Sequence, residues 1–375
     1  MSDMATQIAE QPAQGMGEAT SLSAWQQHHT TAVANVVALM MRKGGAGKTT
    51  LTLLLADALV RFGLRVLIID LDPQGNSSIG VGKKVQLEEV PSLNKLGGKP
   101  AKRPTEPTVL EVIEADIAGV AEDAIQLVDW GYDADEAFPR GGPLRTGQIG
   151  TLGIITAYHA LETEAATWRP GDLEKLATAL LLPTEDSGDV APNVKWDVVL
   201  IDTPPGGSLI SIQAAKAAYH ALLVTQAQRF GVEAIPDTLL LVQEVKDSYK
   251  HEDLDVLGLV FNEYTERSQT QGQLMAQVEE AQSNNDPDYD VPVWKGRLPN
   301  YTVVDKSQAA ETPLSAYLAS GARGERDTAR KVCQVAEAVA LQLLAGIRHP
   351  HADELKALWK QAWPTHQRSS VIEEV

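Results

Sequence analysis

The stretch Ala34-Asn35-Val36-Val37-Ala38-Leu39-Met40 is followed, two residues later, by Lys43-Gly44-Gly45-Ala46-Gly47-Lys48-Thr49-Thr50. The first run is almost continuously apolar, which predicts a strand buried on both faces of a parallel sheet. The glycines of the second run let backbone N–H groups approach phosphate oxygens, and a helix beginning near Lys48 would add its positive end. Helical spacing over 51–62 and an apolar run over 65–70 complete a β–loop–α–β unit. We therefore predict a parallel strand pair around a phosphate-binding loop.

Outward from this unit, apolar runs and helical periodicities alternate along the chain. Further strands are predicted over 152–156, 196–202, 221–225 and 255–262, with a short one over 291–294. Helices are predicted over 108–140, 172–182, 212–219, 232–249, 269–283, 304–319, 327–346 and 352–363, whereas 79–109 is predicted as a loop. Strands that alternate with helices predict an α/β fold with one doubly wound, mostly parallel sheet flanked by helices.

Composition restricts the classes of function. The chain has 375 residues and a net charge of −18, from 32 basic and 50 acidic residues, so any affinity for DNA or membranes must come from a local basic patch. Cys333 is the single cysteine, which excludes a disulfide framework and multi-cysteine metal or iron–sulfur sites. No apolar run reaches the roughly 18 residues that a membrane span needs. A cytoplasmic protein is therefore the expectation.

The phosphate loop departs from the general pattern G-x-x-x-x-G-K-[ST], because Arg42 stands where the first glycine would be. Lys48 is still expected to bridge the β- and γ-phosphates, and the Thr49 hydroxyl to ligate Mg²⁺. A plain glycine-rich turn is the alternative interpretation. The residues expected to bind ATP in this loop are Gly44, Gly45, Ala46, Gly47, Lys48, Thr49 and Thr50.

Lys43 is an additional lysine that is not needed to hold phosphates within one subunit. With it, the loop resembles that of the ParA/MinD group of deviant Walker ATPases, which have a P-loop NTPase fold. The resemblance implies that Lys43 reaches across a nucleotide-sandwich homodimer to the partner's ATP and acts there in catalysis. The alternative is a surface lysine at the mouth of the loop.

Two further motifs extend the resemblance. Asp70-Leu71-Asp72-Pro73-Gln74-Gly75-Asn76 resembles the family motif D-x-D-P-Q-G-N, which implies that Asp72 positions or activates the attacking water. Asp70 is expected mainly to shape the site. Asp197 to Gly206 resembles a Walker B strand and switch segment, so Asp202 is expected to hold Mg²⁺, through a water, and Gly206 to donate its N–H to the γ-phosphate. The alternative for both is an ordinary strand that ends in an Asp and Pro turn.

Weaker matches concern the adenine. Asn262 ends a strand that resembles the one whose terminal Asn hydrogen-bonds the base, although a strand-end Asn is often only a cap. Pro299 lies in a segment that resembles the one that closes over the base. Thr225 stands where the family often has Pro, which leaves the following loop uncertain.

The resemblance covers roughly residues 34–346, and within the family the motifs look most like those of ParA proper. It implies a Mg²⁺-dependent, slow and partner-stimulated ATPase that dimerises on ATP, binds DNA nonspecifically on the nucleoid, and partitions a plasmid or chromosome with a ParB-type protein. A ParA-like ATPase that positions a protein cargo is the first alternative. Only 33 residues precede the first strand, so an N-terminal helix-turn-helix region is not expected.

A MinD-like membrane-associated regulator is the second alternative, and it depends on the helix 352–363. Lys356 and Lys360 are the only basic residues within it, and the chain ends in Glu373-Glu374-Val375, so no membrane binding is expected and packing on the domain is favoured. The expected organisation is a flexible tail over 1–33, a ParA-like ATPase domain over 34–350 with an insert at about 79–150, and a C-terminal helix and tail over 351–375. Candidate DNA contacts are the basic loop 83–103 and Arg229, Lys246, Lys250, Arg267, Arg297, Lys306, Arg323, Arg326, Arg330 and Lys331.

Overall fold

The computed structural model describes residues 35–90, 101–131, 149–183, 190–192, 195–265 and 267–363. A seven-stranded sheet in the order β11-β10-β1-β9-β2-β6-β5 forms its centre. The strands are β1 (Val36–Met40), β2 (Val66–Asp70), β5 (Gln126–Val128), β6 (Leu152–Ile155), β9 (Val198–Asp202), β10 (His220–Gln226) and β11 (Asp255–Asn262). All neighbouring pairs are parallel except β5 with β6. The predicted fold class is therefore confirmed, while the predicted tail 1–33 lies outside the described residues.

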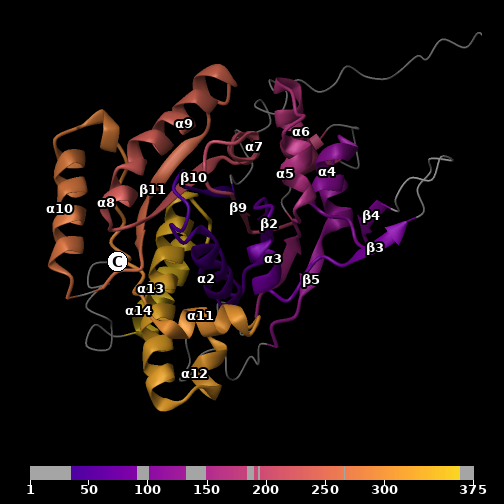
Figure 1. Cartoon of the computed structure of the whole chain (residues 1–375). Helices are drawn as coiled ribbons and strands as arrows, with labels where there is room; N and C mark the ends of the chain where they lie inside the picture. The colour runs from indigo at the N-terminus through magenta and orange to yellow at the C-terminus, as the bar shows by residue number, and fades with distance from the viewer. Residues whose placement is uncertain are drawn as a thin grey trace, which may run out of the picture.

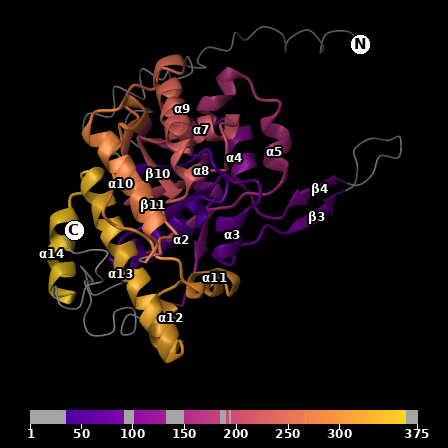
Figure 2. The same ribbon diagram turned by 60° about the vertical axis from the view of Figure 1, so that its left-hand side comes forward.

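The strands are buried on both faces because alternate side chains enter two separate cores. In β1, Val36, Ala38 and Met40 pack in one core, whereas Val37 and Leu39 pack in the other. Helices cover both cores, so the molecule has three layers, as Figures 1 and 2 show.

Helices of the second core come from both ends of the chain. They are α2 (Lys48–Arg61), α11 (Thr302–Ala309), α12 (Ala316–Ser320), α13 (Arg323–Gly346) and α14 (Ala352–Ala362). The other core is covered by α4 (Val109–Ala115), α5 (Ala160–Ala165), α6 (Lys175–Ala179), α7 (Leu209–Ala217), α8 (Arg229–Val232), α9 (Ala234–Ser248) and α10 (Gln269–Ser283). The segments predicted as strand 255–262 and helix 269–283 form β11 and α10 with the predicted bounds.

The helix predicted over 304–319 is wrong as one element, because the structure divides it into α11 and α12. Glu311 adopts a left-handed conformation with φ 55°, and Pro313 has no N–H to continue a helical ladder. The single helix predicted over 172–182 is also wrong. A 3₁₀ turn over Pro170–Glu174 precedes α6, and Leu181–Pro183 forms β7, which pairs with β8 (Val190–Pro192).

The long helix predicted over 108–140 is wrong beyond its first two turns. Thr108 and Glu111 form a capping box that starts α4, but Asp116 takes a left-handed conformation with φ 50° and ends it. A 3₁₀ turn over Val120–Ala124 then leads into β5, which joins the main sheet from within the expected insert at about 79–150. The rest of that prediction, over 132–140, lies outside the described residues.

Two smaller predictions also fail. The loop predicted over 79–109 contains α3 (Asn76–Gly80) at its start and the paired strands β3 (Leu87–Val90) and β4 (Ala101–Pro104), which project from the body in Figure 2. The strand predicted over 291–294 makes only an isolated bridge between Val293 and Leu259, because Pro292 lacks the N–H that a ladder needs.

Candidate functional site

The phosphate loop joins the end of β1 to the start of α2 and relies on glycine at two positions. Gly45 has φ 73° and Gly47 has φ 90°, a region that side chains other than glycine rarely enter. At Gly47 a Cβ atom would also lie 1.6 Å from Nδ2 of Asn262. The Asn262 side chain therefore lies directly against the backbone of the loop, in the space that a side chain at position 47 would need.

Residues from two other strands hold the loop in place. The Asn262 amide at the end of β11 donates to the Ala46 carbonyl at 3.3 Å. The Gln226 amide at the end of β10 donates to the Gly45 carbonyl at 2.7 Å. Gln226 was not predicted as a site residue, although its position at the carboxyl end of a buried parallel strand is the place where such residues gather.

Lys48 begins α2 and points back into the loop. Its side chain is almost completely buried, and its Nζ donates to the Met41 carbonyl at 3.2 Å. Burial lowers the pKa of Lys48, while the charges of Asp202 and Asp72 oppose this shift. The ammonium therefore lies in a desolvated place beside two carboxylates, where it can attract a phosphate strongly.

Asp202, Thr49 and Ser77 meet at the end of β9. The hydroxyls of Thr49 and Ser77 each donate to Oδ2 of Asp202 at 2.7 Å. The second oxygen, Oδ1, is buried and has no hydrogen-bond partner among the described residues. Burial raises the pKa of Asp202 to about 6, and the hydroxyls and Lys48 limit the rise. An oxygen-rich set with one carboxylate oxygen left over fits Mg²⁺, which binds proteins through a few oxygen ligands.

Asp70 and Asp72, at the end of β2, have different surroundings. Asp70 is fully buried and accepts from the Ser78 hydroxyl at 2.7 Å and the Ser78 N–H at 2.8 Å. Burial, followed by the charge of Asp202, raises the pKa of Asp70 to about 8. Asp72 accepts from the Gln74 N–H at 3.0 Å and keeps a small exposed surface. Asp70 is thus enclosed by its serine partner, whereas Asp72 reaches the surface, and the predicted roles of Asp70 in shaping the site and of Asp72 in positioning water stay predictions.

The segment after β9 is tied to the phosphate loop. Gly206 has φ 93°, and its N–H donates to the Arg42 carbonyl at 2.8 Å. The Thr203 hydroxyl donates to the Leu39 carbonyl at 2.6 Å. The N–H predicted to contact a γ-phosphate thus has a protein acceptor in this structure, and it would have to exchange that acceptor for phosphate.

A cavity of about 170 Å³ lies beside the loop and contains both residues predicted to contact adenine. Its lining is Thr50, Leu54, Asn262, Glu263, Leu298, Pro299, Asn300, Tyr301, Val304 and Asp305. The segment around Pro299 is fixed to β11 through backbone bonds such as Leu298 N–H to the Phe261 carbonyl at 3.0 Å. The structure therefore brings Asn262, Pro299 and the start of α2 together around one space beside the loop.

Lys43 stands apart from this cluster. It is exposed at the mouth of the loop, and its Nζ lies 5.0 Å from the ring centroid of Phe230, a side chain that is itself 66% exposed. Lys48, in contrast, is turned into the loop. Of the two lysines of the motif, Lys48 therefore lies inside the subunit and Lys43 lies at its surface.

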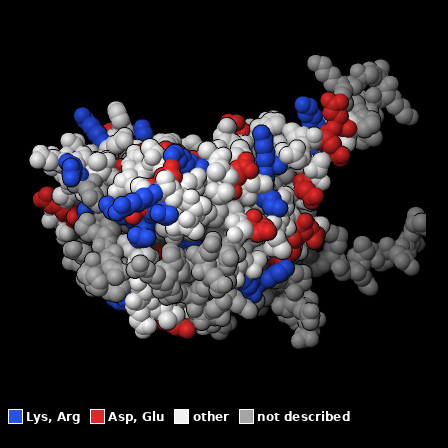
Figure 3. Space-filling view, turned by 90° about the horizontal axis from the view of Figure 1, so that it is seen from below, with Lys and Arg blue, Asp and Glu red and all other residues white. Residues whose placement is uncertain are grey.

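Several of the candidate DNA contacts are paired with carboxylates, and part of the basic loop 83–103, over 91–100, lies outside the described residues. Arg229, Arg297, Lys306 and Arg330 make ion pairs with carboxylates of the same chain. On the face in Figure 3, Lys and Arg are interspersed with Asp and Glu. Part of the basic set is exposed on the first turns of α13, namely Arg323, Arg326 and Lys331.

The C-terminal helix α14 packs on the domain through its apolar side. Leu355 and Trp359, two of the residues that a membrane-binding helix would present to lipid, are fully buried. Within the described residues, no helix has the length and apolar character to cross a bilayer.

Comparisons with known proteins find relatives of this chain in sequence and in fold. Residues 37–314 match the model of the CobQ/CobB/MinD/ParA nucleotide binding domain. The chain is 28% identical to the chromosome-partitioning ATPase Soj of Thermus thermophilus, over 66% of this chain and 74% of that protein. It is 27% identical to the chromosome partitioning protein ParA of Caulobacter vibrioides, over 65% and 74%. The McdA–ATP complex of Cyanothece has a similar fold, with a TM-score of 0.54, 19% identity and coverage of 81% of this chain and 96% of that one.

Proposed function

The chain belongs to the CobQ/CobB/MinD/ParA nucleotide-binding family, and on this premise we propose that it is a ParA-like ATPase that closes into a homodimer on binding ATP. The names of the Soj and ParA relatives support a role in partition of a chromosome or plasmid. The observation that carries the proposal is the contrast between the two lysines. Lys48 is buried in its own loop, whereas Lys43 is exposed at the mouth, where a second subunit can receive it.

In the proposed mechanism, the backbone of 44–50 and the Lys48 ammonium bind the phosphates. Thr49 and Asp202 would hold Mg²⁺, which would neutralise charge on the phosphates. Asp72 accepts a hydrogen bond from the attacking water and orients it. Lys43 crosses to the partner's ATP, so turnover depends on dimerisation, and loss of the γ-phosphate releases Gly206 and opens the dimer.

The direct test is ATP turnover by the full chain as protein concentration and nonspecific duplex DNA are varied. Slow basal hydrolysis that rises with both supports the proposal, because two subunits must meet. Turnover that is independent of protein concentration, and that the Lys48→Ala variant lacks, would show that the protein is an ATPase but would contradict the proposed dimer.

DNA binding and a ParB-type partner belong to the same proposal. The exposed basic residues at the start of α13 support the DNA step, and the net charge of −18 favours moderate affinity. Reversing Arg326 and Lys331 to Glu should weaken binding at low salt and flatten its salt dependence, as measured by fluorescence anisotropy. Reversing Arg348 and Lys356 to Glu, two exposed residues outside the candidate set, is the control with the same change of charge, and equal loss in both double variants would reject this surface.

A further inference from the structure

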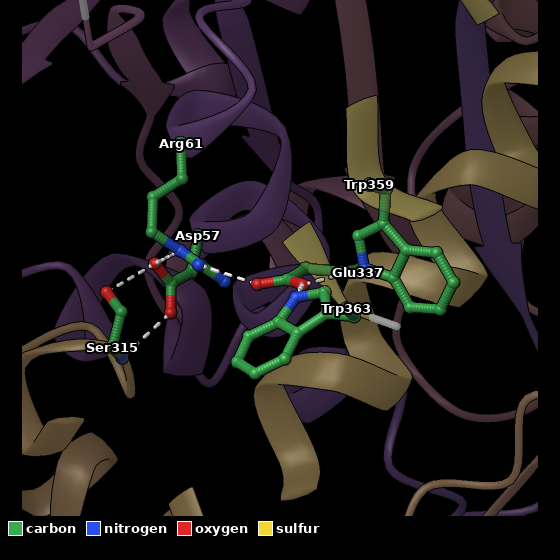
Figure 4. Close-up of polar contacts among 6 residues, drawn as sticks. All are labelled: Asp57, Arg61, Ser315, Glu337, Trp359 and Trp363. Carbon is green, nitrogen blue, oxygen red and sulfur yellow. Dashed lines mark hydrogen bonds and ion pairs between the residues drawn. The ribbon is translucent and has the colours of Figure 1, made fainter. Parts of the chain in front are cut away.

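A continuous set of buried polar contacts links the C-terminal helix to the phosphate-loop helix, as Figure 4 shows. The indole N–H groups of Trp359 and Trp363 each donate to Oε2 of Glu337 at 2.9 Å. The other carboxylate oxygen of Glu337, on α13, pairs with the Arg61 guanidinium at 2.7 Å. Arg61 is the last residue of α2, the helix that begins with Lys48.

The contacts continue from Arg61 to Asp57 and Ser315. Arg61 pairs with Asp57, one turn earlier on α2, at 3.1 Å. Asp57 accepts from the Ser315 hydroxyl at 2.7 Å and from the Ser315 N–H at 3.0 Å. Arg61, Asp57 and Glu337 are each at most 2% exposed. Buried charges of this kind depend on their partners, since removing one leaves an uncompensated group.

Ser315 follows the segment that lines the cavity of about 170 Å³ beside the loop, which we call the base cavity because Asn262 and Pro299, the residues predicted to contact adenine, line it. Val304 and Asp305, on α11, line that cavity, and α11 reaches Ser315 through a short turn. Gln308 of α11 donates to the Thr50 hydroxyl at 3.1 Å, which makes a second link to α2. Between these links the packing is close, and the remaining cavity measures about 10 Å³. These contacts attach α11 to α2, and the ion pair of Lys306 with Glu325 attaches it to α13 as well.

We propose that α14 sets the affinity of the base cavity for nucleotide through Glu337, Arg61, Asp57 and Ser315, which act as positioning residues. The inference rests on the nucleotide-binding part of the proposed function. When the contacts are complete, α11 is held in place before nucleotide arrives. When they are broken, binding must also order α11, and affinity falls. A partner that displaces α14 would therefore weaken nucleotide binding without touching the phosphate loop.

The first arm of the test measures the Kd for Mg-ADP with the full-length chain by titration calorimetry, well below the unfolding temperature. Ser315→Ala removes one donor to Asp57 and should raise the Kd roughly three- to tenfold. Turnover at saturating ATP should stay unchanged, because Lys48, Asp72 and Asp202 are untouched. Ser320→Ala, an exposed serine at the end of α12, the helix that Ser315 precedes, is the control and should keep the wild-type Kd.

The second arm uses Trp363→Phe, which keeps a ring but removes the donor to Glu337. The Kd should rise as in Ser315→Ala, and the double variant should show less than the product of the two changes. Trp168→Phe, a half-buried tryptophan in the other core, is the control. If Ser315→Ala and Trp363→Phe both keep the wild-type Kd, even with a lower Tm, the contacts only stabilise the fold and the inference is overturned. Failure of the wild type to bind Mg-ADP would instead overturn the proposed function.

Discussion

The proposed function gives Lys48 and Asp72 different roles that mutation can separate. Lys48 is buried against the loop, where we propose that it binds phosphate, and Asp72 accepts from the Gln74 N–H, where we propose that it orients the attacking water. We expect Lys48→Ala to abolish ATP binding. Asp72→Ala should retain binding and lower turnover by about 100-fold or more. Equilibrium binding of a fluorescent ATP analogue and a phosphate-release assay separate the two effects, and unchanged turnover in either variant would refute the site.

The loop glycines allow a test of close packing. Gly45 and Gly47 both have positive φ, so alanine at either costs about 1–2 kcal/mol in strain. Only at Gly47 would the new Cβ also strike Asn262, whereas nothing lies within 4 Å at Gly45. Gly47→Ala should therefore lose ATP binding and Gly45→Ala should only weaken it, with circular dichroism to confirm folding. Equal affinities would contradict the contact between Asn262 and the loop.

Several residues of the candidate site were predictable because their motifs lie at the ends of predicted strands. Lys48, Thr49 and Asp202 follow such motifs, and the structure brings them within contact of one another or of shared partners. Ser77 and Ser78 were missed, although they directly follow the second motif and their hydroxyls bind Asp202 and Asp70. Hydroxyl partners of this kind follow from tertiary packing, which a linear spacing does not encode.

At the scale of elements, α14 behaves as part of the core. Trp359 is fully buried, so Trp359→Ala should lower the free energy of unfolding by about 3–5 kcal/mol in urea denaturation. Lys356→Ala, at an exposed position on the same helix, should change it by no more than about 0.5 kcal/mol. Equal, small effects would mean that α14 is not anchored, and ATP-dependent liposome binding lost on removing 352–375 would favour the membrane alternative.

Strands and long helices were predicted well where one periodicity acts over many residues, as in β11 and α10. Prediction failed where a short-range event decides the outcome. The left-handed Glu311 divides α11 from α12, and pairing with β8 draws Leu181 out of a helical pattern. Apolar spacing reports which residues are buried, but not where a turn interrupts the hydrogen-bond ladder.

At the scale of the whole molecule, stability should depend on pH through His251. Burial lowers the pKa of His251, and the charges of Lys216 and Lys246 lower it further, against the Ala218 carbonyl and Asp253. The unfolded chain then takes up a proton near its ordinary pKa of 6.5 that the folded protein resists. This contribution is present above pH 6.5 and is lost as the pH falls below it.

His251→Gln keeps a donor for the Ala218 carbonyl but removes the titrating ring. Urea denaturation at pH 7.5 and 5.5 should therefore give a smaller loss of stability for this variant than for the wild type. An equal loss of unfolding free energy in both proteins would show that groups other than His251 cause the loss of stability at low pH.

The central claim, that ATP drives two copies of this chain together, is tested most directly by size-exclusion chromatography with light scattering. The Asp72→Ala variant should elute with Mg-ATP at twice the 40.4 kDa chain mass, and as a monomer with ADP or without nucleotide. Adding Lys43→Ala to that variant should reduce the dimer while ATP remains bound. A monomer under every condition, with ATP binding intact, would contradict the account.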